Sequence, residues 1–309
     1  MTIRFAVARP HELAPYVESL RVLERDIPYP IADGADEFRI DHGNAYHPFF
    51  SEMGESFFVL ALDGERVVGT VTGVHRQAML RARATKVLYA ADLKIARDHR
   101  GGALARRLLS FAARSLFTSR GGLSWRLAYV AAMRGKHGDV TRTVRGVHLG
   151  KVARPLAELS LYFVAPQELA ALDVTSAPAP LRPRHEDGID LSPPRAGEAV
   201  DAPGFVTTAG KKDLRLRSTG APWPLVHLRH GPADASPSWP SYLKSCGEAM
   251  LARGLLGPAC FGVDARLTDH VAWLSRRALE PAAACNIHAL SLTLRTRGAA
   301  WLHLATSEI

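Results

Sequence analysis

Residues 86–117, KVLYAADLKIARDHRGGALARRLLSFAARSLF, decide the fold of this chain. Residues 87–95 have the apolar composition of a strand, which ends at a charged turn containing Gly101 and Gly102. An amphipathic helix follows, with one apolar face made by Leu104, Leu108, Phe111, Ala112 and Leu116. The first amides of a helix have no partners within it, and the helix dipole places partial positive charge there. The segment therefore predicts a seat for an anion such as a phosphate.

This segment resembles the acetyl-CoA motif of the GCN5-related N-acetyltransferase (GNAT) superfamily, whose loop reads Arg/Gln-x-x-Gly-x-Gly/Ala. Arg100, Ala103, Leu104 and Ala105 take these places, with Ala103 instead of the usual glycine. The resemblance implies acetyl-CoA or another acyl-CoA as cofactor and acyl donor. It places backbone groups of Leu93 and Ile95 beside the pantetheine arm. The pyrophosphate is expected on the turn and the first helical residues, which are Arg100, Gly101, Gly102, Ala103, Leu104, Ala105 and Arg106.

Length and composition suit a globular protein of two domains. The chain has 309 residues, and 47% of them are hydrophobic and 22% charged. No apolar run approaches the roughly 20 residues that span a bilayer, and the N-terminus lacks the apolar segment of a secretory signal. We therefore expect a cytoplasmic protein without membrane contact. The three cysteines, Cys246, Cys260 and Cys285, lack CxxC spacing, which indicates buried apolar side chains rather than disulfides or a zinc site.

The net charge of +9 does not by itself indicate nucleic-acid binding. The basic residues are dispersed, and no basic run alternates with aromatic residues as in an RNA-binding motif. Attraction for a polyanionic cofactor such as CoA, or for an acidic carrier protein, is a sufficient explanation. We therefore expect no nucleic-acid partner.

The predicted elements of residues 1–166 follow the order of the GNAT fold. They are a strand at 2–8, a helix at 11–23, a hairpin of 56–62 and 66–74, the strand at 87–95, the helix from 104, and strands at 127–133 and 159–164. Asp63-Gly64-Glu65 supplies the turn of the hairpin. The expected fold class is α/β (α+β), a GNAT-like mixed sheet flanked by helices, with residues 1–166 as the acyl-CoA-binding domain.

Residues 167–220 are rich in proline and predict a linker running into irregular structure. Residues 221–309 then repeat the order strand, helix, strand, helix, with 287–294 and 299–306 as a closing hairpin. This order suggests a second, degenerate GNAT-like half and hence a tandem arrangement. Its loop at 231–240, GPADASPSWP, has no Arg-Gly-x-Gly turn, and its prolines remove amides that a pyrophosphate needs. The alternative is an unrelated α/β extension.

Acyl transfer to an amine requires a base near the thioester, and Asp92 is the candidate. Its apolar neighbours on the strand predict a pKa raised towards neutrality, whereas an ion pair with Lys94 is the structural alternative. Tyr129 and Tyr89 are candidates for proton transfer, or else core residues. Many GNAT enzymes place a tyrosine before a Gly-Phe pair on the last helix, but Arg142 stands there in this chain. Arg142 could instead stabilise the departing thiolate.

Substrate contacts in GNAT enzymes usually come from the segment between the first two strands. Here this segment contains polar candidates for a substrate head group, which are Asp41, His42, Tyr46 and His47, and aromatic residues for an apolar pocket. Two histidines five residues apart in a loop do not indicate a metal site, and we expect none.

The expected function is therefore acyl transfer from an acyl-CoA to a small-molecule amine acceptor, by direct attack in a ternary complex. A first alternative is a transferase that takes its acyl group from acyl carrier protein, because 21–26 and 36–50 faintly resemble acyl-homoserine-lactone synthases and N-acyl amino acid synthases. A second alternative is a binding module that senses acyl-CoA without turnover. The sequence does not fix the acceptor, the acyl chain length or the oligomeric state.

Overall fold

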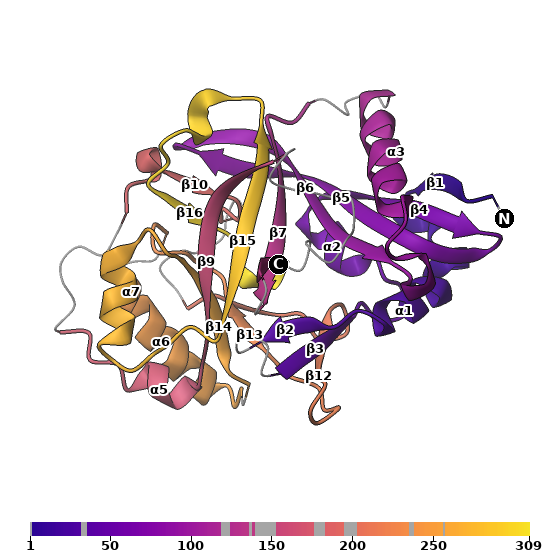
Figure 1. The fold of residues 1–309 in the computed structure, drawn as a ribbon. Coiled ribbons are helices and arrows are strands. Elements are labelled where there is room, and N and C mark those ends of the chain that lie inside the picture. The colour runs from indigo at the N-terminus through magenta and orange to yellow at the C-terminus, as the bar shows by residue number, and fades with distance from the viewer. Residues whose placement is uncertain are drawn as a thin grey trace.

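The structure, a computed structural model, describes residues 2–31, 36–118, 124–135, 138–139, 153–175, 183–194, 203–234, 238–255 and 257–309. Its centre is a large mixed sheet in the strand order β1-β4-β5-β6-β7-β15-β9-β14-β13-β11. Strands from both halves of the chain thus share one sheet (Figure 1).

The N-terminal half of the sheet is built from antiparallel strands followed by a parallel crossover. These strands are β1 (Arg4–Ala8), β4 (Glu55–Asp63), β5 (Arg66–Leu80), β6 (Arg83–Ile95) and β7 (Leu127–Gly135). The crossover helix α3 (Leu104–Thr118) covers one face, and α1 (Val17–Arg25) lies on the other (Figure 1). The short helix α2 (Pro48–Met53) packs against β4 and β5.

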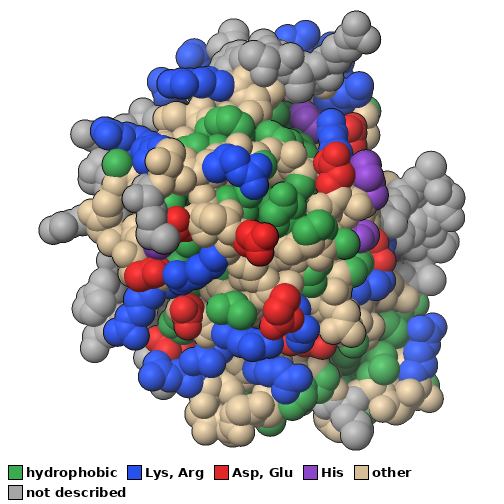
Figure 2. Space-filling view, turned by 90° about the vertical axis from the view of Figure 1, so that its right-hand side faces the viewer, with side chains coloured by type: hydrophobic (Ala, Val, Ile, Leu, Met, Phe, Trp, Pro, Cys, Tyr) green, Lys and Arg blue, Asp and Glu red, His purple; other side chains and the backbone are tan. Residues whose placement is uncertain are grey.

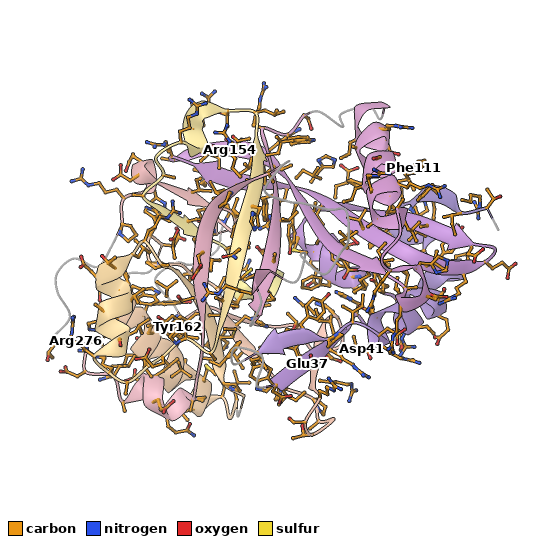
Figure 3. The ribbon with its side chains drawn as sticks, in the orientation of Figure 1. Glu37, Asp41, Phe111, Arg154, Tyr162 and Arg276 are labelled. Carbon is orange, nitrogen blue, oxygen red and sulfur yellow. The ribbon has the colours of Figure 1, made fainter. Side chains whose placement is uncertain are left out.

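A small second sheet joins distant parts of the chain. β3 (Asp36–Asp41) pairs with β2 (Tyr29–Ile31) on one side and with β12 (Asp213–Leu216) on the other. Figure 3 shows Glu37 and Asp41 on this sheet and Phe111 on α3, on opposite sides of the large sheet.

The C-terminal half contributes its own helices and a second hydrophobic core. Its elements are β9 (Arg154–Val164), α5 (Pro166–Ala170), β10 (Gly188–Asp190), β11 (Phe205–Thr207), β13 (Val226–Leu228), α6 (Trp239–Ala252), β14 (Ala259–Asp264), α7 (Thr268–Ser275), β15 (Ala283–Ser291) and β16 (Trp301–His303). The short strand β8 (Gly138–Asp139) pairs antiparallel with the end of β7. Trp239, Trp273 and Leu243 are fully buried where α6 and α7 meet the sheet. Burial of such large side chains is the main stabilising term here.

The two halves share a strand–helix–strand unit. β6 and β7 pair in parallel around α3, and β13 and β14 pair in parallel around α6. At the start of α6, however, the Ser238 hydroxyl accepts a hydrogen bond from the Ser241 amide at 3.3 Å, and Pro240 lies in the first turn. A helix start capped by its own chain offers fewer amides to an anion. The degeneracy of the second half stays a prediction.

Two predictions about the C-terminal half need correction. Residues 287–294 and 299–306 do not form a hairpin, because β15 inserts between β7 and β9 while β16 pairs in parallel with β10. The segment 167–220 is not wholly irregular, because it contains β10, β11, β12 and most of α5. The proposed domain boundaries stay a prediction.

Two further observations concern the helices and the surface. Among the described helices, none has both the length and the apolar run needed to cross a membrane. Figure 2 shows a face on which Lys and Arg side chains are spread among Asp, Glu and apolar ones.

Candidate functional site

The site begins where two central strands separate. β6 and β7 are paired only at Val87–Leu127, Leu88–Ala128 and Tyr89–Tyr129. Beyond Tyr89, β6 runs on to Ile95 and β7 to Gly135, without a register pair between them in the described residues. The backbone of β6 facing this gap is therefore available to a ligand.

A bulge on β6 lies directly after this split. The register between β5 and β6 shifts between Thr70 and Thr72, so that Ala91 and Lys94 are the paired residues on β6. Asp92 lies between them with a left-handed φ of 58°. Aspartate tolerates this conformation better than bulky residues do. Bulges commonly redirect a side chain at functional sites, and here the redirected side chain is Asp92.

Asp92 belongs to a buried network of charged and hydrogen-bonding side chains. The Lys94 ammonium contacts the carboxylates of Asp92 and, at 2.8 Å, Glu24. The Tyr46 hydroxyl donates to Asp92, and Lys94 Nζ lies 3.2 Å from Tyr46 Oη. His42 contacts Glu24 through Nδ1 and through its amide at 3.2 Å. Lys94 and Glu24 are 1% and 2% exposed, so the network holds together residues from α1, the loop before α2, and β6.

The predicted rise in the pKa of Asp92 is wrong. Burial alone would raise this pKa, but the charge of Lys94 and hydrogen bonds from Lys94 and Tyr46 hold it below the ordinary value. The same balance, with burial opposed by Lys94 and His42, lowers the pKa of Glu24. Asp92 is therefore a carboxylate near neutral pH, as in the alternative of an ion pair with Lys94.

A partly enclosed cavity of about 120 Å³ lies beside this network. It occupies the gap between β6 and β7 and extends under the small sheet and α2. Its walls are mainly apolar and aromatic, formed by Tyr29, Phe38, Ile40, Phe49, Phe50, Tyr89, Ala91, Ala131, Met133, Leu161, Phe163, Leu214, Trp223, Leu225, Cys260 and Ile309. The polar lining residues are His42, Asp92, Thr208, Lys212, His227 and Thr306. Such a cavity, with a few placed polar groups, has the character of a small-molecule site.

The predicted anion seat is exposed and open. Gly101, Gly102 and Ala103 are exposed, and the amides of residues 101–106 donate to no acceptor among the described residues. A Cβ at Gly102 would meet nothing closer than the His99 carbonyl oxygen at 3.9 Å. Within the part of the chain that the structure describes, Gly102 therefore has room for a ligand, and unpaired amides of this kind can bind an anion.

The arginines of the seat differ in their roles. Arg100 holds the loop in place, because its side chain donates hydrogen bonds to the backbone carbonyls of Ile95 at 2.9 Å and Asp26 at 3.2 Å. Arg106 is exposed, and Arg107 lies over the Phe5 ring at 5.2 Å. Arg106 is thus the side chain that is better placed to meet a phosphate.

The predicted catalytic residue Tyr129 lies outside the network around Asp92. Tyr129 is buried at the last paired position of the split, where it stacks on Tyr89 at 4.8 Å and its hydroxyl accepts from Arg76 at 3.4 Å. Tyr89 lines the cavity, whereas Tyr129 does not. Arg142 lies outside the described residues.

Of the predicted substrate residues, two reach the site. His42 lines the cavity and Tyr46 binds Asp92. Asp41 instead accepts from the Gly43 amide at 2.9 Å in a turn, and His47 precedes α2 with its ring 3.3 Å from the Ser51 hydroxyl. Sequence patterns did not single out Glu24 or Lys212, because the two side chains come from separate elements and no local motif links them. Lys94 was named only as an ion-pair partner of Asp92.

Two groups of described residues have metal-ligand geometry. Glu24, His42 and Asp92 form one group, but the Lys94 ammonium contacts both carboxylates and takes the place of a cation. Asp190, Asp234 and His303 form the other, with His303 Nδ1 2.9 Å from Asp190. Burial alone would lower the pKa of His303, but Asp190 raises it above the ordinary value.

The backbones of Gly43 and Gly210 lie close together, and this contact helps to position the nearby Lys212 in the cavity wall. Gly43 has a φ of 71°, and a Cβ there would lie 2.5 Å from the carbonyl oxygen of Gly210. We expect Gly43→Ala to destabilise the protein by about 2–3 kcal/mol, because it adds both backbone strain and a clash. Gly64→Ala is the matched control, since Gly64 has a φ of 62° but nothing within 4 Å. Urea denaturation measures both, and an equal loss in the two variants would show that the Gly43–Gly210 contact is unimportant.

Comparisons with known proteins agree with this geometry. Residues 18–134 match the family model described as Acetyltransferase (GNAT) family. A search of curated proteins finds no significant match. Saccharomyces cerevisiae N-myristoyltransferase with bound myristoyl-CoA has a similar structure, with a TM-score of 0.52 at 10% identity over 94% of this chain and 79% of that one. A tandem GNAT protein from the clavulanic acid biosynthesis pathway has a TM-score of 0.50 at 8% identity over 94% and 99%.

Residues 18–134 therefore form a domain of the GNAT superfamily. At such low identities the two structures establish a shared fold, and that fold extends over nearly the whole chain. The expected fold class, a GNAT-like mixed sheet with helices on its faces, is confirmed.

Proposed function

We propose that this protein transfers an acyl group from an acyl-CoA to an amine. The observation that carries the proposal is the alignment of three features along β6: the split from β7, the bulge at Asp92, and the open amides after Arg100. A ligand with its pyrophosphate on the loop and its arm along β6 would bring its far end to the cavity. The family match supports CoA as the group carrier.

For acyl transfer the protein mainly has to bind and orient the two substrates. Acyl-CoA, when bound, supplies an activated thioester carbonyl. An acceptor ammonium first loses one proton, through a carboxylate base, to solvent. The neutral nitrogen then forms a bond to the carbonyl carbon, the C–S bond breaks, and the second proton of the nitrogen goes to the departing thiolate. Asp92 is ionised at neutral pH and lines the cavity, so it can hold and orient the incoming ammonium. The apolar walls exclude water from the thioester.

Asp92→Asn tests the role of this carboxylate. We expect kcat/KM for an amine to fall by about 10- to 100-fold, because the variant keeps the shape but loses the charge and the proton acceptor. Acetyl-CoA affinity should stay within about twofold, because Asp92 is remote from the pyrophosphate loop. Steady-state kinetics across pH provides the check. An unchanged rate would remove Asp92 from the reaction.

Calorimetry combined with thiol release tests the proposed function itself. Titration with CoA, acetyl-CoA and longer acyl-CoAs measures binding, and release of free CoA thiol across an amine panel measures transfer. Binding of acyl-CoA with amine-dependent thiol release is the expected result. Failure of every acyl-CoA to bind would contradict it.

The same experiment separates the two alternatives. A sensor would bind acyl-CoA without releasing thiol to any amine. A carrier-protein enzyme would accept acyl groups from acyl carrier protein in preference to CoA. The roles assigned to Tyr129 and Arg142 stay predictions.

A further inference from the structure

Among the described residues, Lys212 is a buried cation without an anionic partner. Lys212 is 8% exposed, and no carboxylate of that part of the chain lies within ion-pair distance of its ammonium. The centre of the Phe49 ring lies 4.6 Å from Nζ. By contrast, the similarly buried Lys94 and Arg76 each contact a carboxylate. A buried charge without a counter-ion is costly, which points to a partner that arrives with a ligand.

The backbone holds Lys212 firmly in the cavity wall. Its amide donates to the Thr208 carbonyl at 2.8 Å, and its own carbonyl accepts from the Thr208 hydroxyl at 2.8 Å. The next residue, Asp213, begins β12 and pairs with Asp41 of β3. Lys212 is therefore anchored in the cavity wall by its backbone, and its side chain is buried rather than at the surface.

Burial lowers the pKa of Lys212 to about 8, which leaves it mostly protonated at neutral pH. The charged and titratable groups that face it are Asp92 and Lys94 on β6, His227 on β13, Cys260 on β14 and Cys285 on β15. Burial, with a further effect of Lys212, lowers the pKa of His227 to about 3, so this ring is neutral. Asp92 does not form an ion pair with Lys212. The cavity wall therefore presents two separate charged groups, the Lys212 ammonium and the Asp92 carboxylate.

The rest of the lining sets the shape of the ligand. Aromatic and aliphatic side chains fill the walls between these two groups, among them Phe49, Phe163 and Trp223. A matching molecule has an ammonium for Asp92, a carboxylate for Lys212 and an apolar body between or beside them. Free hydrophobic amino acids have this chemistry.

We propose that Lys212 binds the carboxylate of the acceptor, and that the acceptors are amines bearing a carboxylate on an apolar body, the class of hydrophobic amino acids. This inference rests on the proposed function, since it concerns the acceptor of the same site. Lys212 acts as a specificity-determining residue, because its charge selects among amines.

The test compares ligands that differ only in the carboxylate. Calorimetry without CoA measures L-phenylalanine against phenethylamine, and L-leucine against 3-methylbutylamine. We expect the amino acids to bind at least about 10-fold more tightly than the amines lacking the carboxylate. Lys212→Met should abolish this preference. Lys211→Met is the matched control, because Lys211 is the adjacent residue and pairs with Glu52 at the surface. A wild-type protein without the preference, or a preference that survives Lys212→Met, would overturn the proposal.

The pH dependence of this preference in Lys212→Arg is a further measurement, and a purely structural role of Lys212 would not change it. The preference of the wild type should fade as pH rises through about 8, where the ammonium loses its proton, whereas the arginine variant should keep it. Comparison of succinyl-CoA with butyryl-CoA tests whether Lys212 binds a carboxylate of the acyl group instead. A Lys212-dependent preference for succinyl-CoA alone would overturn the proposal. Acetyl-CoA binding is measured separately. It tests the proposed acyl-CoA-dependent function, whereas the comparison of amino acids with amines tests the role of Lys212.

Discussion

Lys94→Met is expected to lower the free energy of unfolding by about 3–5 kcal/mol at neutral pH. The methionine fills a similar volume but leaves two carboxylates, Glu24 and Asp92, buried without the ammonium between them. These side chains are 2% and 5% exposed, so water cannot replace the lost charge without opening the core. Chemical denaturation with a linear extrapolation measures the loss.

The pH dependence of this loss identifies its cause. Native Glu24 and Asp92 have lowered pKa values, so their contribution to stability is present above their unfolded pKa values and disappears as pH falls. The difference between wild type and Lys94→Met should therefore be largest near neutral pH and shrink in acid. Lys86→Met, an exposed lysine on the same strand, should change stability little. A pH-independent loss in Lys94→Met would indicate lost packing rather than lost charge.

Gly102→Glu is expected to weaken acetyl-CoA binding by at least about 100-fold. The new carboxylate would lie beside the amides that are proposed to bind the diphosphate. Its negative charge would repel the negative charge of the diphosphate strongly at such short range. The free protein should fold normally, because a side chain at residue 102 points into open space and Gly102 has no left-handed φ. Calorimetric titration with acetyl-CoA measures the affinity, and the thermal midpoint checks the fold.

Gly102→Gln separates charge from bulk. It has the size of glutamate without its charge, so it should lose clearly less affinity than Gly102→Glu. Wild-type affinity in the glutamate variant would show that the pyrophosphate does not bind at this loop. Equal losses in the two variants would assign the effect to bulk.

Local patterns predicted most of the N-terminal fold. The apolar runs 56–62 and 66–74 and the Asp63-Gly64-Glu65 turn predicted the hairpin of β4 and β5, which pair as expected with Asp63 opposite Arg66. The next hairpin was missed, because its turn is Arg81-Ala82, two non-glycine residues with φ of 50° and 59°. Arg81 is held there by donating to the carbonyls of Arg295 at 3.0 Å and Arg297 at 2.6 Å. Such support from distant residues leaves no local signal.

The candidate site also combines features that local sequence patterns predict with features that depend on distant residues. Strand, turn and helix motifs are local, so the loop at Gly102 and the strand of Asp92 could be predicted. The pKa of Asp92 could not, because its value depends on Lys94 and Tyr46 being brought to the same buried point. Lys212 comes from a segment far along the chain, and only the pairing of β12 with β3 carries it to the cavity.

The position of β15 affects how the molecule is made. This strand supplies the neighbour of both β7 and β9, yet it follows both of them far along the chain. Until residues 283–291 are synthesised, the edges of β7 and β9 that β15 covers lack this neighbour, and unpaired strand edges favour association with other chains. Truncation before β15 would therefore leave a fragment prone to association, and the newly made protein closes its central sheet only after these nine residues are added.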